Sequence, residues 1–158
     1  MDKRFNWTFG SGHLVICGDL FNRGRNVTEF LWLLYRLEDK AKAAGGYVHV
    51  ILGNHDIMNL SGDLRFVDRK YLLSARSLGM DYAKLYDQNT ELGSWLRTKN
   101  IMEKIGDKIF VHGGISPSLL NLKLSIQQIN DMARPCYATQ KKDLSVMMQL
   151  VFGKDGPF

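Results

Sequence analysis

The chain has 158 residues, 45% of them hydrophobic, and a formal net charge of +5, because 21 lysines and arginines outnumber 16 aspartates and glutamates. This size and composition suit one globular domain and exclude a disordered, collagen-like or disulfide-scaffold protein. The mildly basic balance favours anionic ligands such as phosphates. Because lysine and arginine form no dense run, it does not indicate a nucleic-acid-binding protein.

The N-terminal residues lack the apolar segment of a signal peptide, and apolar stretches such as 30–35 are too short to span a bilayer. We therefore expect a cytoplasmic protein that has no membrane partner. Cys17 and Cys136 are far apart in the sequence, which argues against a disulfide framework or a zinc knuckle. The apolar run around Cys17 predicts a buried thiol.

Three short apolar runs predict buried strands over 13–17, 47–52 and 108–111, and each run ends at glycine and polar residues. Between the first two, apolar residues at helical spacing predict a helix over 27–44. Strand, helix and strand in this order indicate a right-handed crossover between parallel strands. The sequence therefore predicts an α/β fold in which the three strands are parallel neighbours, or near neighbours, in one sheet, with their carboxyl ends at the ligand edge.

The remaining apolar patterns predict shorter elements. His13 and His49 lie within the first two predicted strands, and we interpret both as structural. Helices are predicted over 70–78, 82–98, 126–133 and 141–151, and a strand over 101–105 turns at Gly106-Asp107 into the third run.

The first predicted strand ends at Gly18-Asp19, and Asn22 and Arg23 follow in the loop toward the helix. A carboxylate at a strand end can bridge two cations, and an arginine on the next loop can bind a phosphate with two hydrogen bonds. Taken alone, Asp19 is also typical of a helix cap or turn, and Arg23 of an exposed arginine.

The second predicted strand ends in Gly53-Asn54-His55-Asp56. Asn54 offers a neutral oxygen ligand, His55 a proton carrier near neutral pH, and Asp56 a carboxylate that can cap or orient. The same run is compatible with a tight turn followed by a capped helix.

The third predicted strand ends in His112-Gly113-Gly114. An imidazole there can ligate a transition metal, although His112 alone also fits a core or turn histidine. Three strand ends that meet at one edge bring together Asp19, Asn54 and His112, and independent turns explain this set poorly. The combination predicts a metal site.

At these residues the chain resembles the calcineurin-like metallophosphoesterases, whose motifs are DxH, GDxxDRG, GNH[DE], a lone histidine and GHxH. Residues 18–24 read GDLFNRG, residues 53–56 read GNHD and residues 112–114 read HGG. Residues 110–117 are most similar to a bacterial branch related to phosphoprotein phosphatases. The resemblance covers about 13–117 and implies an α/β metallophosphoesterase sandwich of mostly parallel buried strands with flanking helices.

The resemblance also implies roles for individual residues. Asp19 would bridge two divalent metals (Mn, Fe or Zn), and Asn54 and His112 would ligate the second of them. His55 would protonate the leaving oxygen and Arg23 would hold the phosphoryl oxygens. Asn22 stands where the family usually has the aspartate that holds this histidine, and it can hydrogen-bond without supplying charge.

The sequence departs from the family pattern at both ends, because no DxH precedes Asp19 and no GHxH follows His112. We therefore interpret residues 1–158 as a single, incomplete catalytic domain that binds one metal or none. Flanking strands missing from the sheet would leave exposed edges, which favour a homo-oligomer.

Three functions remain open. The first is a metal-dependent phosphatase that acts on phosphoproteins, of the serine/threonine type, or on small phosphorylated substrates. The second is a dinucleoside polyphosphate hydrolase, because GDLxNRG with GNHD is similar to bacterial dinucleoside tetraphosphatases. The third is a non-catalytic module of the same fold that binds a phosphate or a partner.

Overall fold

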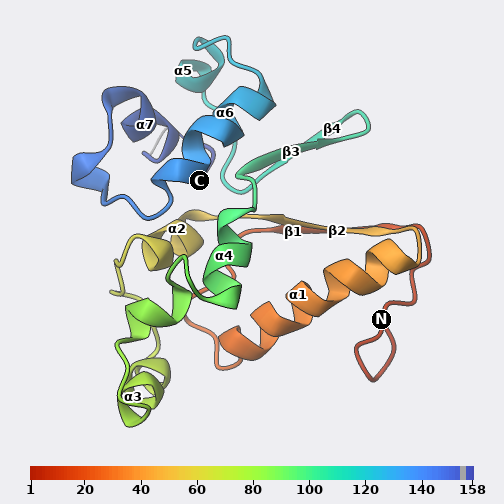
Figure 1. The fold of residues 1–158 in the computed structure, drawn as a ribbon. Coiled ribbons are helices and arrows are strands. Elements are labelled where there is room, and N and C mark those ends of the chain that lie inside the picture. The colour runs from red at the N-terminus through yellow and green to blue at the C-terminus, as the bar shows by residue number, and fades with distance from the viewer. Residues whose placement is uncertain (154–155) are drawn as a thin grey trace.

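Two parallel strands, β1 (His13–Cys17) and β2 (Tyr47–Ile51), lie at the centre of the computed structural model, which describes residues 1–153 and 156–158. Helix α1 (Val27–Ala43) connects them and packs along one face of the pair (Figure 1). The register pairs His13 with Tyr47 and Cys17 with Ile51, so both strands end at the same edge. The predicted strand–helix–strand crossover and the α/β class are confirmed.

Helix α1 forms because its apolar residues recur on one face. That face is buried against the strands, whereas Phe30 and Trp32 on the other faces are partly exposed. Glu29 lies in the first turn and Lys40 and Lys42 in the last turn, each where its charge opposes the helix dipole. The buried residues of the inner face are Val27, Leu31, Leu34, Leu37 and Ala41.

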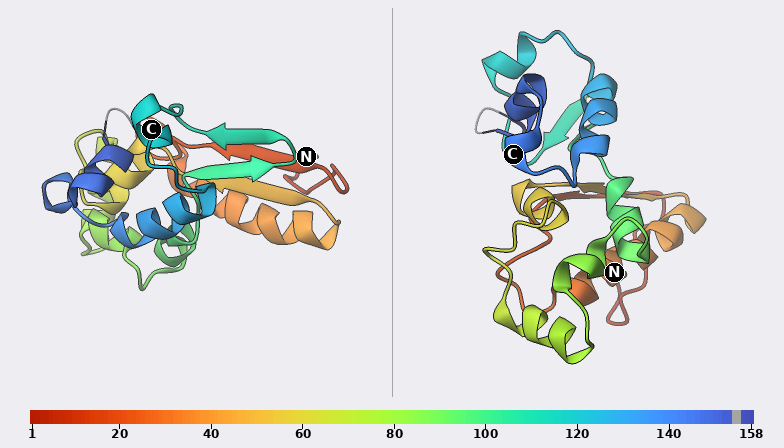
Figure 2. Two further views of the ribbon diagram at one scale, coloured as in Figure 1. Left: turned by 90° about the horizontal axis from the view of Figure 1, so that it is seen from above. Right: turned by 60° about the vertical axis from the view of Figure 1, so that its left-hand side comes forward.

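The third predicted strand does not join this parallel pair. Strand β4 (Lys108–Val111) pairs with β3 (Met102–Ile105) in an antiparallel hairpin, so the expectation that all three strands are neighbours or near neighbours in one sheet is wrong for the third strand. The physical reason is the short turn at Gly106, whose φ of +61° reverses the chain within two residues. The hairpin lies on the side of β1–β2 opposite to α1 (Figure 2).

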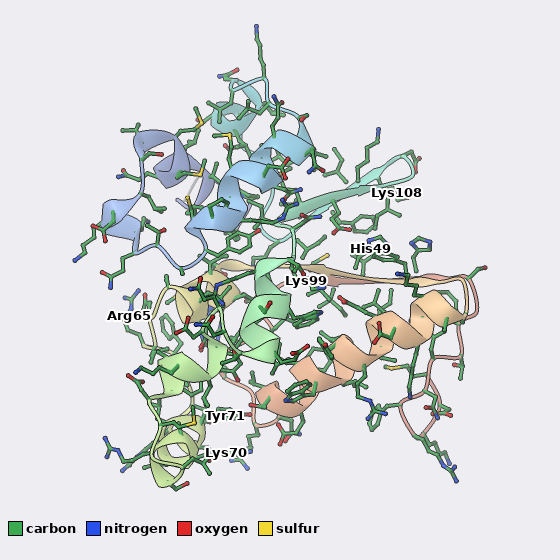
Figure 3. The ribbon with its side chains drawn as sticks, viewed as in Figure 1. His49, Arg65, Lys70, Tyr71, Lys99 and Lys108 are labelled. Atoms are coloured by element: carbon green, nitrogen blue, oxygen red, sulfur yellow. The ribbon has the colours of Figure 1, made fainter. Side chains whose placement is uncertain are left out.

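Backbone and side-chain hydrogen bonds connect the two strand pairs. Leu52 N–H donates to the carbonyl of Asn100 over 2.8 Å, just before β3 begins. The ring of His49, labelled in Figure 3, is buried with Nδ1 2.5 Å from Glu103 Oε2 of β3, and its Nε2 lies 2.8 Å from His13 Nδ1. These contacts connect the buried His49 to β3 on one side and to the exposed His13 on the other.

The other helices are short and surround the strand ends. The predicted helix over 82–98 is broken, because the Thr90 hydroxyl accepts from Gly93 N–H and starts a new helix after a 3-10 turn. In the same way Ser145 begins the last helix and divides the predicted segment 141–151. The elements are α2 (Asn54–Leu60), α3 (Arg69–Ser77), η1 (Tyr82–Tyr86), α4 (Glu91–Arg97), α5 (Pro117–Leu120), α6 (Ile126–Ala133), η2 (Arg134–Cys136), η3 (Lys141–Asp143) and α7 (Val146–Val151).

The core lies mainly between β2 and α1 and extends under α4 and α6. Strand β2 is buried over Val48–Ile51, whereas β1 is only partly covered and Cys17 is exposed. The predicted burial of this thiol is therefore wrong. Among the described residues β1 pairs with β2 alone, so its other edge has no strand against it. Within residues 1–153 and 156–158, no helix is long and apolar enough to cross a membrane.

Candidate metal centre

The loop after β1 has an unusual backbone conformation. Gly18, Asp19, Asn22 and Arg23 have φ angles of +81°, +56°, +70° and +54°. Residues with a Cβ adopt positive φ at a cost of about 1–3 kcal/mol each, and such conformations cluster at functional sites where the surroundings hold them. Three of the residues singled out in the sequence, Asp19, Asn22 and Arg23, therefore lie in one constrained loop.

Asp56 holds this loop in place from α2. One carboxylate oxygen accepts from the N–H groups of Leu20 and Phe21 over 2.8 and 3.1 Å, and the other accepts from Gly53 N–H over 2.7 Å. The carboxyl is fully buried, and this burial raises its pKa to about 6 although the three N–H donors oppose the shift. One side chain thus fixes the loops that follow β1 and β2 relative to each other.

His112, which follows β4, faces the end of β1. Its Nδ1 lies 2.6 Å from the carbonyl oxygen of Cys17, and its Nε2 lies 3.4 Å from Asp19 Oδ1. Because a carbonyl only accepts, Nδ1 carries the ring proton and Nε2 of the neutral ring keeps its lone pair. An imidazole whose second nitrogen donates to a backbone carbonyl is the arrangement that metal-ligating histidines show.

Glycines allow this close approach of three strand ends. A Cβ on Gly18 would lie 2.6 Å from Gly53 Cα and 2.8 Å from His112 Nδ1. A Cβ on Gly53 would lie 3.0 Å from Asp19 Oδ1. Any side chain at either position would therefore push the Asp19 and His112 groups apart.

The residues present fit a divalent metal, although the ligand set is small. Asp19 supplies a carboxylate and His112 an imidazole nitrogen, and Asn54 is exposed at the start of α2, directly after Gly53. Over residues 1–153 and 156–158 no three histidine, cysteine or acidic side chains converge, so the amide oxygen of Asn54 would be the third ligand. A mixed oxygen and nitrogen set suits Mn²⁺, Fe²⁺ or Zn²⁺.

His55 forms a second cluster with the β1 loop. The Arg23 guanidinium lies 2.9 Å from Nε2, and the Asn22 side-chain amide lies 2.7 Å from Nδ1. Because a guanidinium only donates, Nε2 accepts and the ring proton is on Nδ1. The buried Asn22 oxygen has no other partner. Turning the amide so that this oxygen faces the ring lets the oxygen accept from Nδ1–H.

The sequence-predicted residues thus meet in two groups. The structure brings Asp19 to His112, and it brings Asn22 and Arg23 to His55. Asn54 is next to these residues in the chain and lies at the open end of α2. The roles assigned to these residues stay predictions.

Sequence reasoning missed two groups at the site. The Cys17 carbonyl could not be read from a side-chain pattern, because every residue carries one. The exposed ring of Phe66 packs edge-on against His55 at a centroid distance of 5.3 Å. Phe66 lies in no periodic run or motif, so no signal marked it.

Comparison with known proteins agrees with this geometry. The model of the family described as calcineurin-like phosphoesterase matches residues 9–154. A cold-active protein-tyrosine phosphatase of a psychrophilic Shewanella species has a structure that superposes with a TM-score of 0.95 at 41% identity, covering 99% of this chain and 48% of that one.

Curated relatives include two kinds of phosphatase. The Shewanella-like protein phosphatase 1 of Plasmodium berghei is 32% identical over 127 residues, which is 79% of this chain and 34% of that protein. A symmetrical bis(5'-nucleosyl)-tetraphosphatase of Vibrio parahaemolyticus is 31% identical over 73% of this chain and 38% of its own length. The chain thus spans about half of the solved structure and little more than a third of these relatives.

Proposed function

Because the chain belongs to the calcineurin-like phosphoesterase family, we propose that it hydrolyses phosphoric esters with a divalent metal, and that phosphorylated proteins are its substrate class. The observation that carries the proposal is the orientation of His112. Its Nδ1 proton is held by the Cys17 carbonyl, which leaves Nε2 beside the Asp19 carboxylate. The phosphatase names of the relatives support the same class of reaction.

The metal would be held by Asp19, Asn54 and His112. When bound, it supplies Lewis-acid stabilisation of the charge on the phosphoryl oxygens. The family implies divalent metals without identifying the element, and manganese is our first choice because two of the three ligands, the Asp19 carboxylate and the Asn54 amide, are oxygen donors of the kind that suit it.

Arg23 would bind the phosphoryl group. In the structure its guanidinium is exposed and rests against Nε2 of His55. A phosphate anion offers the guanidinium opposite charge and two parallel hydrogen bonds, whereas the neutral imidazole offers a single acceptor nitrogen. A bound phosphoryl group therefore draws Arg23 away from the ring.

His55 would then act on the leaving oxygen. Once Arg23 has moved, Nε2 is free to carry the proton that the departing oxygen takes, while Asn22 keeps Nδ1 and the ring orientation fixed. General acid catalysis of this kind contributes about 10²–10⁴-fold to a rate. Aspartate in place of Asn22 would add a negative charge that stabilises the protonated ring, and the neutral amide lacks this charge and stabilises the protonated ring less.

The second candidate is hydrolysis of dinucleoside polyphosphates. It is favoured by the Asn22 motif and by the similarity to symmetrical tetraphosphatases. The third candidate is a module that binds phosphate without turnover, and the small ligand set at Asp19 and His112 favours it.

Turnover with matched variants separates the three candidates. The protein is loaded with Mn²⁺ and assayed with an aryl phosphate, a phosphopeptide and diadenosine tetraphosphate. If the chain is a phosphatase, it should hydrolyse the aryl phosphate and the phosphopeptide. This activity should be lost in Asp19→Asn and kept in Asp107→Asn, whose carboxylate is exposed on the β3–β4 turn. Preference for diadenosine tetraphosphate supports the second candidate. Retained phosphate binding without any turnover supports the third.

We also propose that copies of the chain associate through their sheet edges. Among the described residues each of the four strands has only one strand neighbour, and Tyr47 and Ile109 are about half exposed. Unpaired edges with apolar side chains favour pairing with another strand. Light scattering at increasing concentration should show a mass above that of the monomer, and a strictly monomeric species would contradict this.

A further inference from the structure

A groove of about 630 Å³ opens directly beside Asn54. One wall is α2 with the loop that follows it, and the other is the segment around η3 and α7. Figure 1 shows these two segments facing each other at the same end of the molecule. The groove therefore leads away from the metal centre toward the surface.

The walls of the groove combine an apolar lining with basic residues. Ile57, Leu144 and Phe152 contribute apolar surface. Arg65 is paired with Asp63 through two short hydrogen bonds, so these two charges compensate each other. Figure 3 places Arg65 at the outer side of α2.

Among the described residues that line the groove, Lys141 and Lys142 carry the positive charge that remains after Arg65 and Asp63 compensate each other. Both line it from η3, both are exposed, and neither makes an ion pair with any acidic side chain in the described residues. The two lysines lie on the wall opposite to Asn54. A ligand with negative charge beyond its phosphate could therefore pair with them across the groove.

We propose that this groove binds an acidic peptide segment with apolar side chains that flanks the phosphorylated residue. The proposal rests on the proposed function and adds the substrate class of the same site. A dinucleoside polyphosphate fits less well, because its negative charge is confined to the phosphates and its nucleoside ends are neutral. Carboxylates on a peptide would face the two lysines while its apolar side chains cover the lining.

Binding without turnover tests the proposal. A fluorescein-labelled, unphosphorylated peptide of alternating glutamate and leucine is titrated with the protein in the presence of EDTA, and anisotropy gives Kd. The comparison peptide has glutamine in place of glutamate. The Lys141→Glu/Lys142→Glu variant is matched by Lys104→Glu/Lys108→Glu on the β3–β4 hairpin, remote from the groove (Figure 3).

We expect the groove variant to weaken binding of the acidic peptide at least 10-fold and the hairpin variant to change it less than 2-fold. The Lys141→Gln/Lys142→Gln variant should lie between, because it removes charge without adding repulsion. Salt should weaken binding to the unmodified protein. Equal affinity for both peptides, or equal effects of the two double variants, would overturn the proposal.

Two further outcomes separate this inference from the function on which it rests. Lysine-dependent binding of diadenosine tetraphosphate without binding of the peptide would assign the groove to nucleotides and overturn the proposal. Lysine-dependent peptide binding together with absent turnover of an aryl phosphate would leave the groove assigned as proposed and refute the hydrolytic function.

Discussion

His112 Nδ1 lies 2.6 Å from the carbonyl oxygen of Cys17, so the last residue of β1 sets the orientation of an imidazole that is distant in the sequence. This bond fixes the tautomer and turns the lone pair of Nε2 toward Asp19. The hairpin that carries His112 is thereby tied to the end of the parallel strands. The candidate metal centre depends on this contact, although it uses no side chain of Cys17.

The first prediction concerns Gly18. Replacing it with alanine should lower the free energy of unfolding by about 2–4 kcal/mol, because strain from its φ of +81° adds to a Cβ placed 2.6 Å from Gly53 Cα. Gly62→Ala is the matched control, since Gly62 has a φ of +83° with open space around it. Urea denaturation gives the free energy of unfolding of both variants, and their difference is the contribution of the contact between the added Cβ and Gly53. Equal losses of unfolding free energy would show that the strand ends are not tightly packed.

The second prediction concerns Asp56. Its two oxygens accept from three N–H groups, and the amide in Asp56→Asn can supply only one acceptor oxygen. At least one buried N–H is then unsatisfied, which costs about 1–3 kcal/mol of unfolding free energy. Exposed Asp107→Asn should change stability by less than 0.5 kcal/mol, about the usual limit for a surface substitution. A similar stability of the two variants would contradict the role of Asp56 in joining the loops.

The third prediction concerns pH. Burial raises the pKa of Asp56 from 3.8 to about 6, so the folded protein holds this proton more tightly than the unfolded chain. The contribution of this carboxyl to stability is full below pH 3.8 and is lost as the pH rises to about 6. Denaturation in EDTA across this range should show a fall that Asp56→Asn lacks. If the unfolding free energy of the unmodified protein and of Asp56→Asn changes with pH in the same way, Asp56 does not have the raised pKa.

Much of the site could be predicted from the sequence because its residues follow strands directly. Runs such as Gly53-Asn54-His55-Asp56 reveal a strand end by local composition alone. The pairing of β4 with β3 and the exposure of Cys17 depend on which strands become neighbours, which local patterns do not specify. The contact of Phe66 with His55 is likewise a product of tertiary packing.

The fourth prediction concerns Asn22, which lies 2.7 Å from His55 Nδ1. Aspartate at this position supplies a negative charge that favours the protonated ring. Asn22→Asp should therefore extend hydrolysis to higher pH, and it should accelerate an alkyl phosphate more than an aryl phosphate, because only the poorer leaving group needs a proton. Equal effects on both esters, or a slower variant, would indicate that Asn22 is adapted to dinucleoside polyphosphates.

The central claim is that Asp19 and His112 hold a divalent metal, and the most direct measurement is calorimetric titration of the metal-free protein with Mn²⁺. The geometry predicts one weak site, because the described residues offer few ligands there. Asp19→Asn and His112→Gln should each weaken binding by at least 10-fold, while Asp107→Asn leaves it unchanged. Unaltered Mn²⁺ binding in His112→Gln, or two tight equivalents in the unmodified protein, would contradict the account.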